Sequence, residues 1–321
     1  MAEPNTVTLP DSDRGLRTAV GLLCAGKLVA FPTETVYGLG ADARNAEAVA
    51  GIFAAKGRPG FNPLIVHVAD RPAAERLAVL PPEARALADR FWPGPLTLVL
   101  PRRADSGLSP RATAGLATVA IRVPSHPLAH RLLDAFGGPL AAPSANPSGR
   151  VSATTRAHVL DGLSGRIAAV LGGGACPLGL ESTILGFPGG TPTLLRPGGL
   201  PVEAIAEALG RPVATHAGGD ITAPGQLASH YAPNAALRLD ATAPEPGEVW
   251  LGFGPTAHPG LSLSPTGDLA EAAATLFARL REIDALAAAS GATRIAVAPI
   301  PRTGLGLALK DRLARAAAPR G

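Results

Sequence analysis

The sequence predicts an α/β protein in which a large domain, built on a twisted mixed sheet, is followed by a smaller α/β domain. Three observations support this prediction. Between residues 16 and 209, apolar runs of strand length alternate with stretches of helical length. A Gly- and Pro-rich stretch at 211–234 interrupts the pattern, and a shorter alternation follows it. The chain has 321 residues, 46% of them hydrophobic, which is enough for one large core and one small one.

The first elements have recognisable ends. We expect a helix at 16–24, ended by Gly26, and a buried strand at 28–31. A Gly38/Gly40 turn should follow the strand. Asn45 is a suitable N-cap for a helix through residue 55, and Gly57 suits its C-terminal end.

The rest of the large domain continues the alternation. Helices are expected at 83–91, 128–136, 155–160 and 202–209, and strands at 64–68, 96–100, 119–123, 140–142, 168–171, 183–185 and 193–195. Helices spaced between short strands indicate a mixed sheet with helices packed on it.

We place the large domain at 14–210, a linker or lid at 211–236 and the small domain at 237–321. The small domain should be Rossmann-like, with strands at 249–253 and 295–300 and helices at 269–289 and 305–318.

Charge and composition restrict the class of protein. The net charge of +4 comes from scattered arginines without a polybasic run. The sequence contains no apolar run of about 18 residues, and residues 1–13 lack the order of a signal peptide, so a cytoplasmic protein with no membrane partner is expected. Lysine occurs only at Lys27, Lys56 and Lys310, which makes Lys56 in its Gly/Pro loop a candidate functional cation.

Two motifs suggest chemistry that their context does not favour. Gly38-x-Gly40-x-x-Ala43 is a loose dinucleotide fingerprint, but Pro32 interrupts the preceding strand and no acidic residue lies about 20 residues beyond the glycines. His126 and His130 have the spacing of two metal ligands on a helix, but no third ligand is adjacent. We interpret His126 as the start of a helix.

Other polar residues leave two interpretations open. His67 lies inside an apolar strand and is either a satisfied core histidine or a ligand contact. Arg122 either faces solvent or offers its guanidinium to a carboxylate, and Arg196 either lies on the surface or contacts a phosphate. Ser144 is not in a GxSxG elbow, so we do not interpret it as a hydrolase nucleophile.

Eight segments occur in a characteristic order. They are PTETVYGLG (32–40), KGRPxxxPL (56–64), LIVHV (64–68), WPGPLT (92–97), TVAIRVP (118–124), APSAN (142–146), EST (181–183) and LLRPG (194–198). Together they closely resemble the threonylcarbamoyl-AMP synthase family with the YrdC-like fold. SHYAP (229–233) and the trailing α/β segment resemble the long form of this family, which has an additional C-terminal domain.

The resemblance implies a fold, a reaction and partners. The fold would be a twisted α/β sheet around a positively charged cavity. L-Threonine, bicarbonate or CO2, and ATP with Mg2+ would give threonylcarbamoyl-AMP and pyrophosphate. This product would pass to the machinery that forms threonylcarbamoyladenosine in tRNA, with direct tRNA contact a further possibility. The metal ligands stay unassigned.

The resemblance also implies roles for individual residues. Lys56 and Arg58 would act on the phosphates during catalysis. Threonine would be held by Thr35, His67, Arg122, Ala142 through its backbone, and Ser182. ATP would contact Arg58, Asn62, Thr118, Ser144, Ser152, Arg196 and Tyr231. Residues 223–233, which include Tyr231, would form either a gating lid or a passive spacer.

Two functions from other classes stay open. An RNA-binding module could use the basic cavity, although aromatic residues are only 4% of the chain. A carbamoyl-transfer relative could share the fold and use another substrate, although Thr35, His67, Arg122 and Ser182 match the threonine set.

Overall fold

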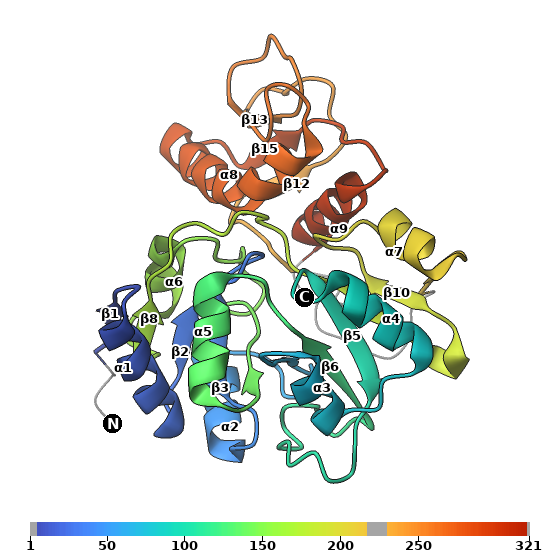
Figure 1. Cartoon of the computed structure of the whole chain (residues 1–321). Helices are drawn as coiled ribbons and strands as arrows, with labels where there is room; N and C mark the ends of the chain where they lie inside the picture. Colours follow the sequence, from blue (N-terminus) through green and yellow to red (C-terminus); the bar gives the residue numbers. More distant parts are fainter. Residues whose placement is uncertain (1–4, 217–229, 320–321) are drawn as a thin grey trace.

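The computed structural model describes residues 5–216 and 230–319, which form a larger and a smaller lobe (Figure 1). Over these residues the larger lobe contains an 11-stranded mixed sheet in the order β1-β8-β2-β3-β7-β4-β6-β5-β9-β10-β11. The smaller lobe contains a 4-stranded sheet in the order β12-β15-β13-β14, in which every pair is parallel. The predicted α/β class and mixed sheet are confirmed.

Most elements of the larger lobe lie close to the predicted ranges, but β1, α3 and β11 were not predicted. Its helices are α1 (Asp13–Cys24), α2 (Ala46–Lys56), α3 (Arg71–Leu77), α4 (Pro82–Phe91), α5 (Pro127–Phe136), α6 (Arg156–Leu163) and α7 (Val202–Leu209). Its strands are β1 (Val7–Leu9), β2 (Val29–Phe31), β3 (Gly38–Asp42), β4 (Ile65–His67), β5 (Leu96–Pro101), β6 (Thr118–Arg122), β7 (Leu140–Ala141), β8 (Ala169–Leu171), β9 (Thr183–Gly186), β10 (Thr193–Arg196) and β11 (Ala214–Thr215).

Local chemistry accounts for several of these ends. The Asn45 side chain accepts hydrogen bonds from two backbone amides of the first turn of α2, and Gly57 ends this helix in the left-handed conformation. His126 caps α5, because its Nδ1 accepts from the backbone amide of Leu128. The prediction that His126 opens a helix is therefore confirmed.

The Gly38/Gly40 segment differs from its prediction, because it is strand β3 and not a turn. It pairs antiparallel with β2, and Phe31 of β2 lies across it. A Cβ atom on Gly40 would lie 2.9 Å from the Phe31 ring. These glycines therefore permit close strand packing, and the turn of a dinucleotide fingerprint is not formed here.

The two faces of the central strands have different neighbours. Val66, Leu98, Ile121 and Leu185 belong to the large core of the lobe. The alternate residues Ile65, Val99, Ala120 and Ile184 form a small separate cluster on the other face. That second face carries the candidate site.

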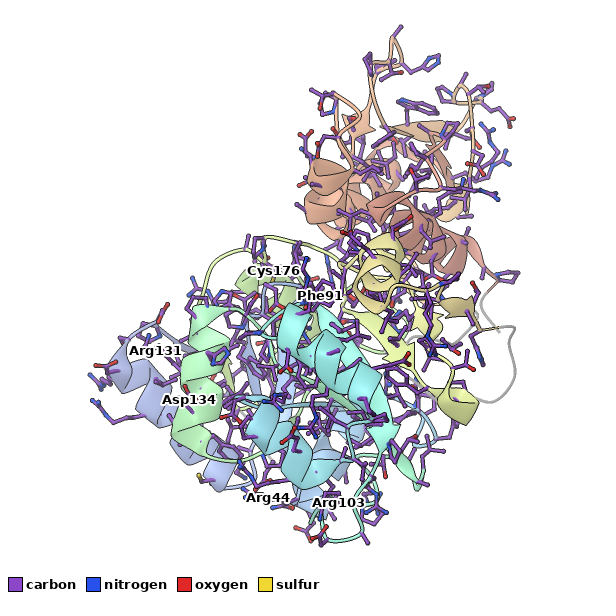
Figure 2. The ribbon with its side chains drawn as sticks, turned by 45° about the vertical axis from the view of Figure 1, so that its right-hand side comes forward. Arg44, Phe91, Arg103, Arg131, Asp134 and Cys176 are labelled. Atoms are coloured by element: carbon purple, nitrogen blue, oxygen red, sulfur yellow. The ribbon has the colours of Figure 1, made fainter. Side chains whose placement is uncertain are left out.

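The smaller lobe has more strands than its sequence predicted. It contains β12 (Ala236–Arg238), β13 (Glu248–Gly252), β14 (Leu261–Ser262), α8 (Leu269–Ser290), β15 (Arg294–Val297) and α9 (Leu305–Ala317). The short strands β12 and β14 were not predicted, and β11 and the first residue of β12, Ala236, lie within the expected linker at 211–236. Figure 2 shows this lobe standing apart above the larger one, and in Figure 1 α8 and α9 lie on its lower side.

None of the helices within 5–216 and 230–319 has the combined length and apolar character needed to cross a membrane.

Candidate active site

Strand register brings two predicted site residues, His67 and Arg122, into one row with Thr97. His67 on β4 is the register partner of Arg122 on β6, and Arg122 is in turn the partner of Thr97 on β5. Register partners project to the same face of a sheet. The Ser182 hydroxyl reaches the end of this row, 2.7 Å from the Thr97 hydroxyl.

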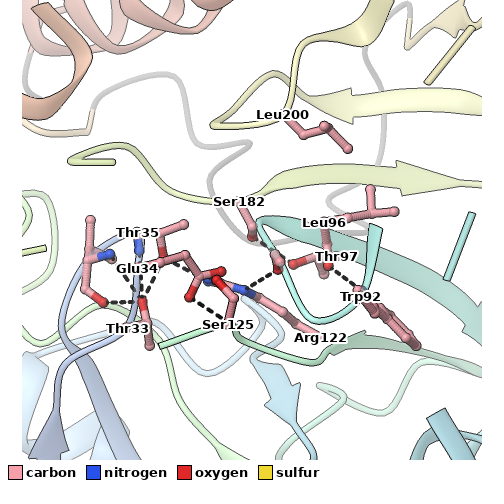
Figure 3. Close-up of polar contacts among 12 residues, drawn as sticks. Thr33, Glu34, Thr35, Trp92, Leu96, Thr97, Arg122, Ser125, Ser182 and Leu200 are labelled. Carbon is pink, nitrogen blue, oxygen red and sulfur yellow. Dashed lines mark hydrogen bonds and ion pairs between the residues drawn. The ribbon is translucent and has the colours of Figure 1, made fainter. Parts of the chain in front are cut away.

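The PTET segment closes over the row directly after β2 (Figure 3). The Thr33 hydroxyl donates to the carbonyl of Val36 at 2.6 Å and shares a hydrogen bond of 2.8 Å with the Thr35 hydroxyl. Both threonine side chains are buried. The turn is therefore held by its own hydroxyl groups, and Thr35 is directed toward Arg122.

Arg122 is the most constrained side chain of the row. Its Nη1 donates to the Thr35 hydroxyl at 2.8 Å, its Nη2 to Glu34 Oε1 at 2.5 Å, and its Nε to the carbonyl of Gly94 at 3.3 Å. The backbone amide of Ser125 donates to the second Glu34 oxygen at 3.1 Å (Figure 3). These contacts use three of the five N–H donors of the guanidinium, so the geometry leaves donors for a ligand.

These residues border a small cavity of about 50 Å3. Nine of the predicted site residues line it: Thr35, Arg58, His67, Arg122, Ala142, Ser144, Ser182, Arg196 and Tyr231. The full predicted threonine set is among them. Thr33, Glu181 and His230, which were not predicted to bind a substrate, complete its polar lining.

Four predicted residues do not line the cavity. Thr118 lies at the opposite end of β6 from Arg122, about 13 Å away along the strand. Ser152 lies behind Glu181 and donates to its Oε1 at 2.6 Å. Asn62 and Lys56 are buried next to the loop that carries Arg58.

Lys56 holds a loop in place. Its Nζ donates to the backbone carbonyl of Ser144 at 2.5 Å and to that of Asn146. Burial, and then the charge of Arg58, hold the pKa of Lys56 well below its usual value. Lys56, which was expected to contact a phosphate, therefore binds the backbone of the Ser144–Asn146 loop in this structure.

Asn62 is the clearest unsatisfied group. It is 1% exposed, and neither its amide nitrogen nor its oxygen has a hydrogen-bond partner in the part of the chain that the structure describes. Buried polar groups without partners are costly, so this side chain is suited to a ligand.

Three arginines give the cavity its positive character. Arg58, Arg122 and Arg196 line it, against the single carboxylate of Glu181. Burial lowers the pKa of Arg58 to about 10, so its guanidinium stays charged at neutral pH. Arg196 Nη2 donates to the backbone carbonyl of Ser182 at 2.8 Å. The residue expected to contact phosphate is therefore bonded directly to a residue expected to contact threonine.

His67 is the neutral member of the site. Burial, and then the charge of Arg122, lower its pKa to about 3. Its Nδ1 has no hydrogen-bond partner among the residues described. His67 is therefore suited to contact a ligand as an uncharged imidazole.

The structure describes only part of the expected lid. Of residues 223–233, positions 223–229 lie outside the described residues, while His230 and Tyr231 line the cavity. Tyr231 is 1% exposed, has a φ of 63° and stacks on Phe277 of α8 with ring centroids 5.5 Å apart. The Tyr231 side chain therefore connects the cavity to the smaller lobe.

The described residues contain no group of three or more His, Cys, Asp or Glu side chains that could hold a metal ion. Of the two carboxylates at the site, Glu34 is paired with Arg122 and Glu181 with Arg312 of α9. Neither is free to act as a metal ligand in this conformation.

The sheet and its cation-lined cavity define the class of protein as YrdC-like. Residues 21–198 match the Sua5/YciO/YrdC family described as "Telomere recombination", and residues 200–318 match "Threonylcarbamoyl-AMP synthase, C-terminal domain". The chain is 43% identical to a threonylcarbamoyl-AMP synthase of Bacillus subtilis, over 97% of this chain and 95% of that protein. It belongs to the threonylcarbamoyl-AMP synthase family.

Two comparisons with one archaeon support the same conclusion. The chain is 42% identical to a threonylcarbamoyl-AMP synthase of Pyrococcus abyssi, over 94% of this chain and 93% of that protein. The crystal structure of P. abyssi Sua5 complexed with L-threonine has a TM-score of 0.88, with 38% identity over 97% of each chain. The resemblance found in the sequence, the YrdC-like fold and the additional C-terminal domain are thereby confirmed.

Proposed function

We propose that this chain forms threonylcarbamoyl-AMP and pyrophosphate from L-threonine, bicarbonate or CO2, and ATP. The observation that carries the proposal is that all five predicted threonine-binding residues line one small cavity with two further arginines. The P. abyssi relative of the same fold binds L-threonine. An RNA-binding module has less support, because a cavity of about 50 Å3 is too small to follow an RNA backbone.

Threonine would be recognised through each of its polar groups. Arg122 has N–H donors that its contacts with Thr35 and Glu34 do not use. These donors would form charge-assisted hydrogen bonds with the threonine carboxylate. The neutral His67 would accept a hydrogen bond from the amine or hydroxyl. The hydroxyls of Thr35 and Ser182 and the backbone of Ala142 would complete the contacts and select threonine over smaller amino acids.

ATP would occupy the adjacent part of the cavity. Arg58 and Arg196 would contact phosphates, with Ser144 beside them. The buried side-chain amide of Asn62, which has no partner among the described residues, would form hydrogen bonds with the nucleotide. Thr118 and Ser152 stay proposed ATP contacts, and each would need a shift in the bound state, since neither lines the cavity here.

The reaction needs positioning and charge stabilisation. The threonine amine captures CO2 as a carbamate, and a carbamate oxygen then attacks the α-phosphorus in line with the departing pyrophosphate. Arg58 and Arg196 would stabilise the charge that develops on the phosphates. Lys56 would contribute by holding the Ser144 loop, and not by direct contact with a phosphate.

The cavity must enlarge to admit the substrates. Sites for small molecules usually enclose about 300–1,000 Å3, whereas this cavity encloses about 50 Å3. His230 and Tyr231 line it without belonging to the sheet, so we propose that their withdrawal opens the site and their return excludes water from the adenylate.

Mg2+ would enter with ATP. Because Glu34 and Glu181 are both paired with arginines, the phosphates and water would supply most of its ligands. Mg2+ supplies charge neutralisation of the triphosphate when bound. The product would pass to the cytoplasmic machinery that completes threonylcarbamoyladenosine in tRNA, and any direct tRNA contact would be made there.

The test is pyrophosphate release by the full-length protein with ATP, Mg2+ and bicarbonate, with threonine or serine as the amino acid. We expect release that requires threonine and bicarbonate together. Equal release with serine would contradict the proposed substrate, and no release with any amino acid would contradict the reaction.

A further inference from the structure

The smaller lobe packs directly on the walls of the cavity. Three residues of the larger lobe, Val36, Val151 and Leu180, belong to the hydrophobic core of the smaller lobe. Each is a neighbour in sequence of a wall residue or its support: Thr35, Ser152 and Glu181. The position of the smaller lobe is therefore linked to the backbone of the site.

Two arginines of the smaller lobe reach the larger lobe: Arg281 of α8, whose Nη2 donates to the backbone carbonyl of Val151 at 2.6 Å, and Arg312 of α9. Arg312 of α9 is 0% exposed, and its Nε donates to Glu181 Oε2 at 2.7 Å. Its Nη2 donates to the backbone carbonyl of Pro197 at 2.9 Å, and its Nη1 to Asp311. Its guanidinium also lies over the Tyr231 ring, 5.2 Å from the centroid. A single side chain of the smaller lobe thus contacts three segments that border the cavity.

The contacts of Arg312 extend to the proposed substrate ligands. Glu181 accepts from the Ser152 hydroxyl on its other oxygen. Glu181 directly precedes Ser182, and Pro197 directly follows Arg196. These two segments are packed tightly together, since a Cβ on Gly198 would lie 2.4 Å from the carbonyl oxygen of Glu181. A displacement of the Glu181 segment should therefore also displace the Pro197 segment.

The charge of Glu181 depends on this partner. Burial alone would raise its pKa, but the charges of Arg312 and Arg196, with hydrogen bonds from Ser152 and Arg312, lower it below its usual value. Glu181 is therefore an ionised, buried carboxylate whose orientation is set from the smaller lobe.

We propose that Arg312 is a positioning residue for the synthase reaction: through Glu181 and the Pro197 carbonyl, the C-terminal lobe holds Ser182 and Arg196 in their binding positions. The catalytic lobe by itself would have an incomplete site. This inference rests on the proposed function, because its effect is measured on the binding of ATP and threonine.

The test compares full-length R312M with the matched variant K310M. Lys310 lies on the same helix and pairs with Asp240 inside the smaller lobe, 2.7 Å away. Loss of a partner that orients a binding group typically costs about 10- to 100-fold. We expect R312M to raise the KM for both substrates at least about tenfold, with a smaller change in kcat, and K310M to leave both constants near wild type.

A double-mutant cycle with E181Q separates positioning from general destabilisation. If Arg312 acts through Glu181, the KM increase caused by R312M should be much smaller in the E181Q background. R312M/E181Q also leaves no unpaired buried carboxylate, which keeps the test valid if R312M folds poorly. R312K should keep a positive charge near Glu181 but lose the planar guanidinium that reaches both Glu181 and Pro197. Compared with R312M, it should therefore recover more of the wild-type melting temperature than of the wild-type KM.

Two results would overturn the inference. One is a KM for R312M that equals wild type, and the other is a KM increase that is the same with Glu181 and with E181Q. Wild-type protein measured in the same assay separates this failure from failure of the proposed function, because an inactive wild type would contradict only the latter.

Discussion

Arg122 offers the sharpest test of the site, because one side chain both binds a buried carboxylate of the protein and is proposed to bind threonine. In R122M, Glu34 loses its ion-pair partner while its side chain stays buried, only 8% exposed. Removing one partner of a buried pair costs about 3–5 kcal/mol of stability. The loss of two charge-assisted hydrogen bonds to threonine, at about 1.5 kcal/mol each, corresponds to a KM about 100-fold higher.

The two effects can be separated with a second substitution. R122M/E34Q removes the unpaired carboxylate, so it should regain most of the lost stability in a denaturant titration while the threonine KM stays high. R44M is the control, since Arg44 forms an exposed pair with Asp42 that should contribute at most about 1 kcal/mol. A threonine KM in R122M/E34Q that equals wild type would refute the role of Arg122.

Three further predictions follow from burial and backbone geometry. Because burial holds the pKa of His67 near 3, below about 6.5 in the unfolded chain, stability should fall as pH drops from about 6.5 toward 3. H67Q should flatten this decline in thermal melts. K56M should raise the KM for ATP up to about 30-fold through two lost hydrogen bonds of about 1 kcal/mol each, whereas K27M, at an exposed site, should not. Gly179 has a φ of 68°, and a Cβ there would lie 2.4 Å from a backbone oxygen of α8. G179A should lose about 1–3 kcal/mol more stability than G247A, which has positive φ but open space.

Each of these predictions has a contrary outcome. An unchanged pH dependence in H67Q would mean that His67 is not the buried neutral group inferred here. A normal ATP KM in K56M would remove the loop-positioning role of Lys56. Equal stability of G179A and G247A would mean that α8 does not approach Gly179 as closely as the structure indicates.

Local signals predicted most elements of the larger lobe correctly. Asn45 and Gly57 marked the two ends of α2 because capping depends on residues within one turn. The failures have a common cause in long-range packing. Gly38 and Gly40 resembled a turn, but Phe31 on the neighbouring strand requires glycine in β3.

The candidate site was predicted unevenly. The ordered motifs identified the residues that line the cavity, because they stand at strand ends whose register then aligns His67 with Arg122. They did not separate residues that line the cavity from residues that support it. Lys56 and Ser152 are supports here, although the family resemblance implied direct contact with ATP or its phosphates.

Arg312 had no usable signal, since it lies in an ordinary amphipathic helix far in sequence from Glu181. Helix caps, strand periodicity and the order of the motifs are local properties, so the amino-acid sequence alone determined the fold class, the family and most of the residues that line the cavity. Whether a charged side chain meets a ligand, a backbone carbonyl or a residue of the other lobe depends on which distant segments become neighbours. Only the tertiary structure decided that Arg122 pairs with Glu34, that Lys56 holds the Ser144 loop and that Arg312 reaches the wall of the cavity.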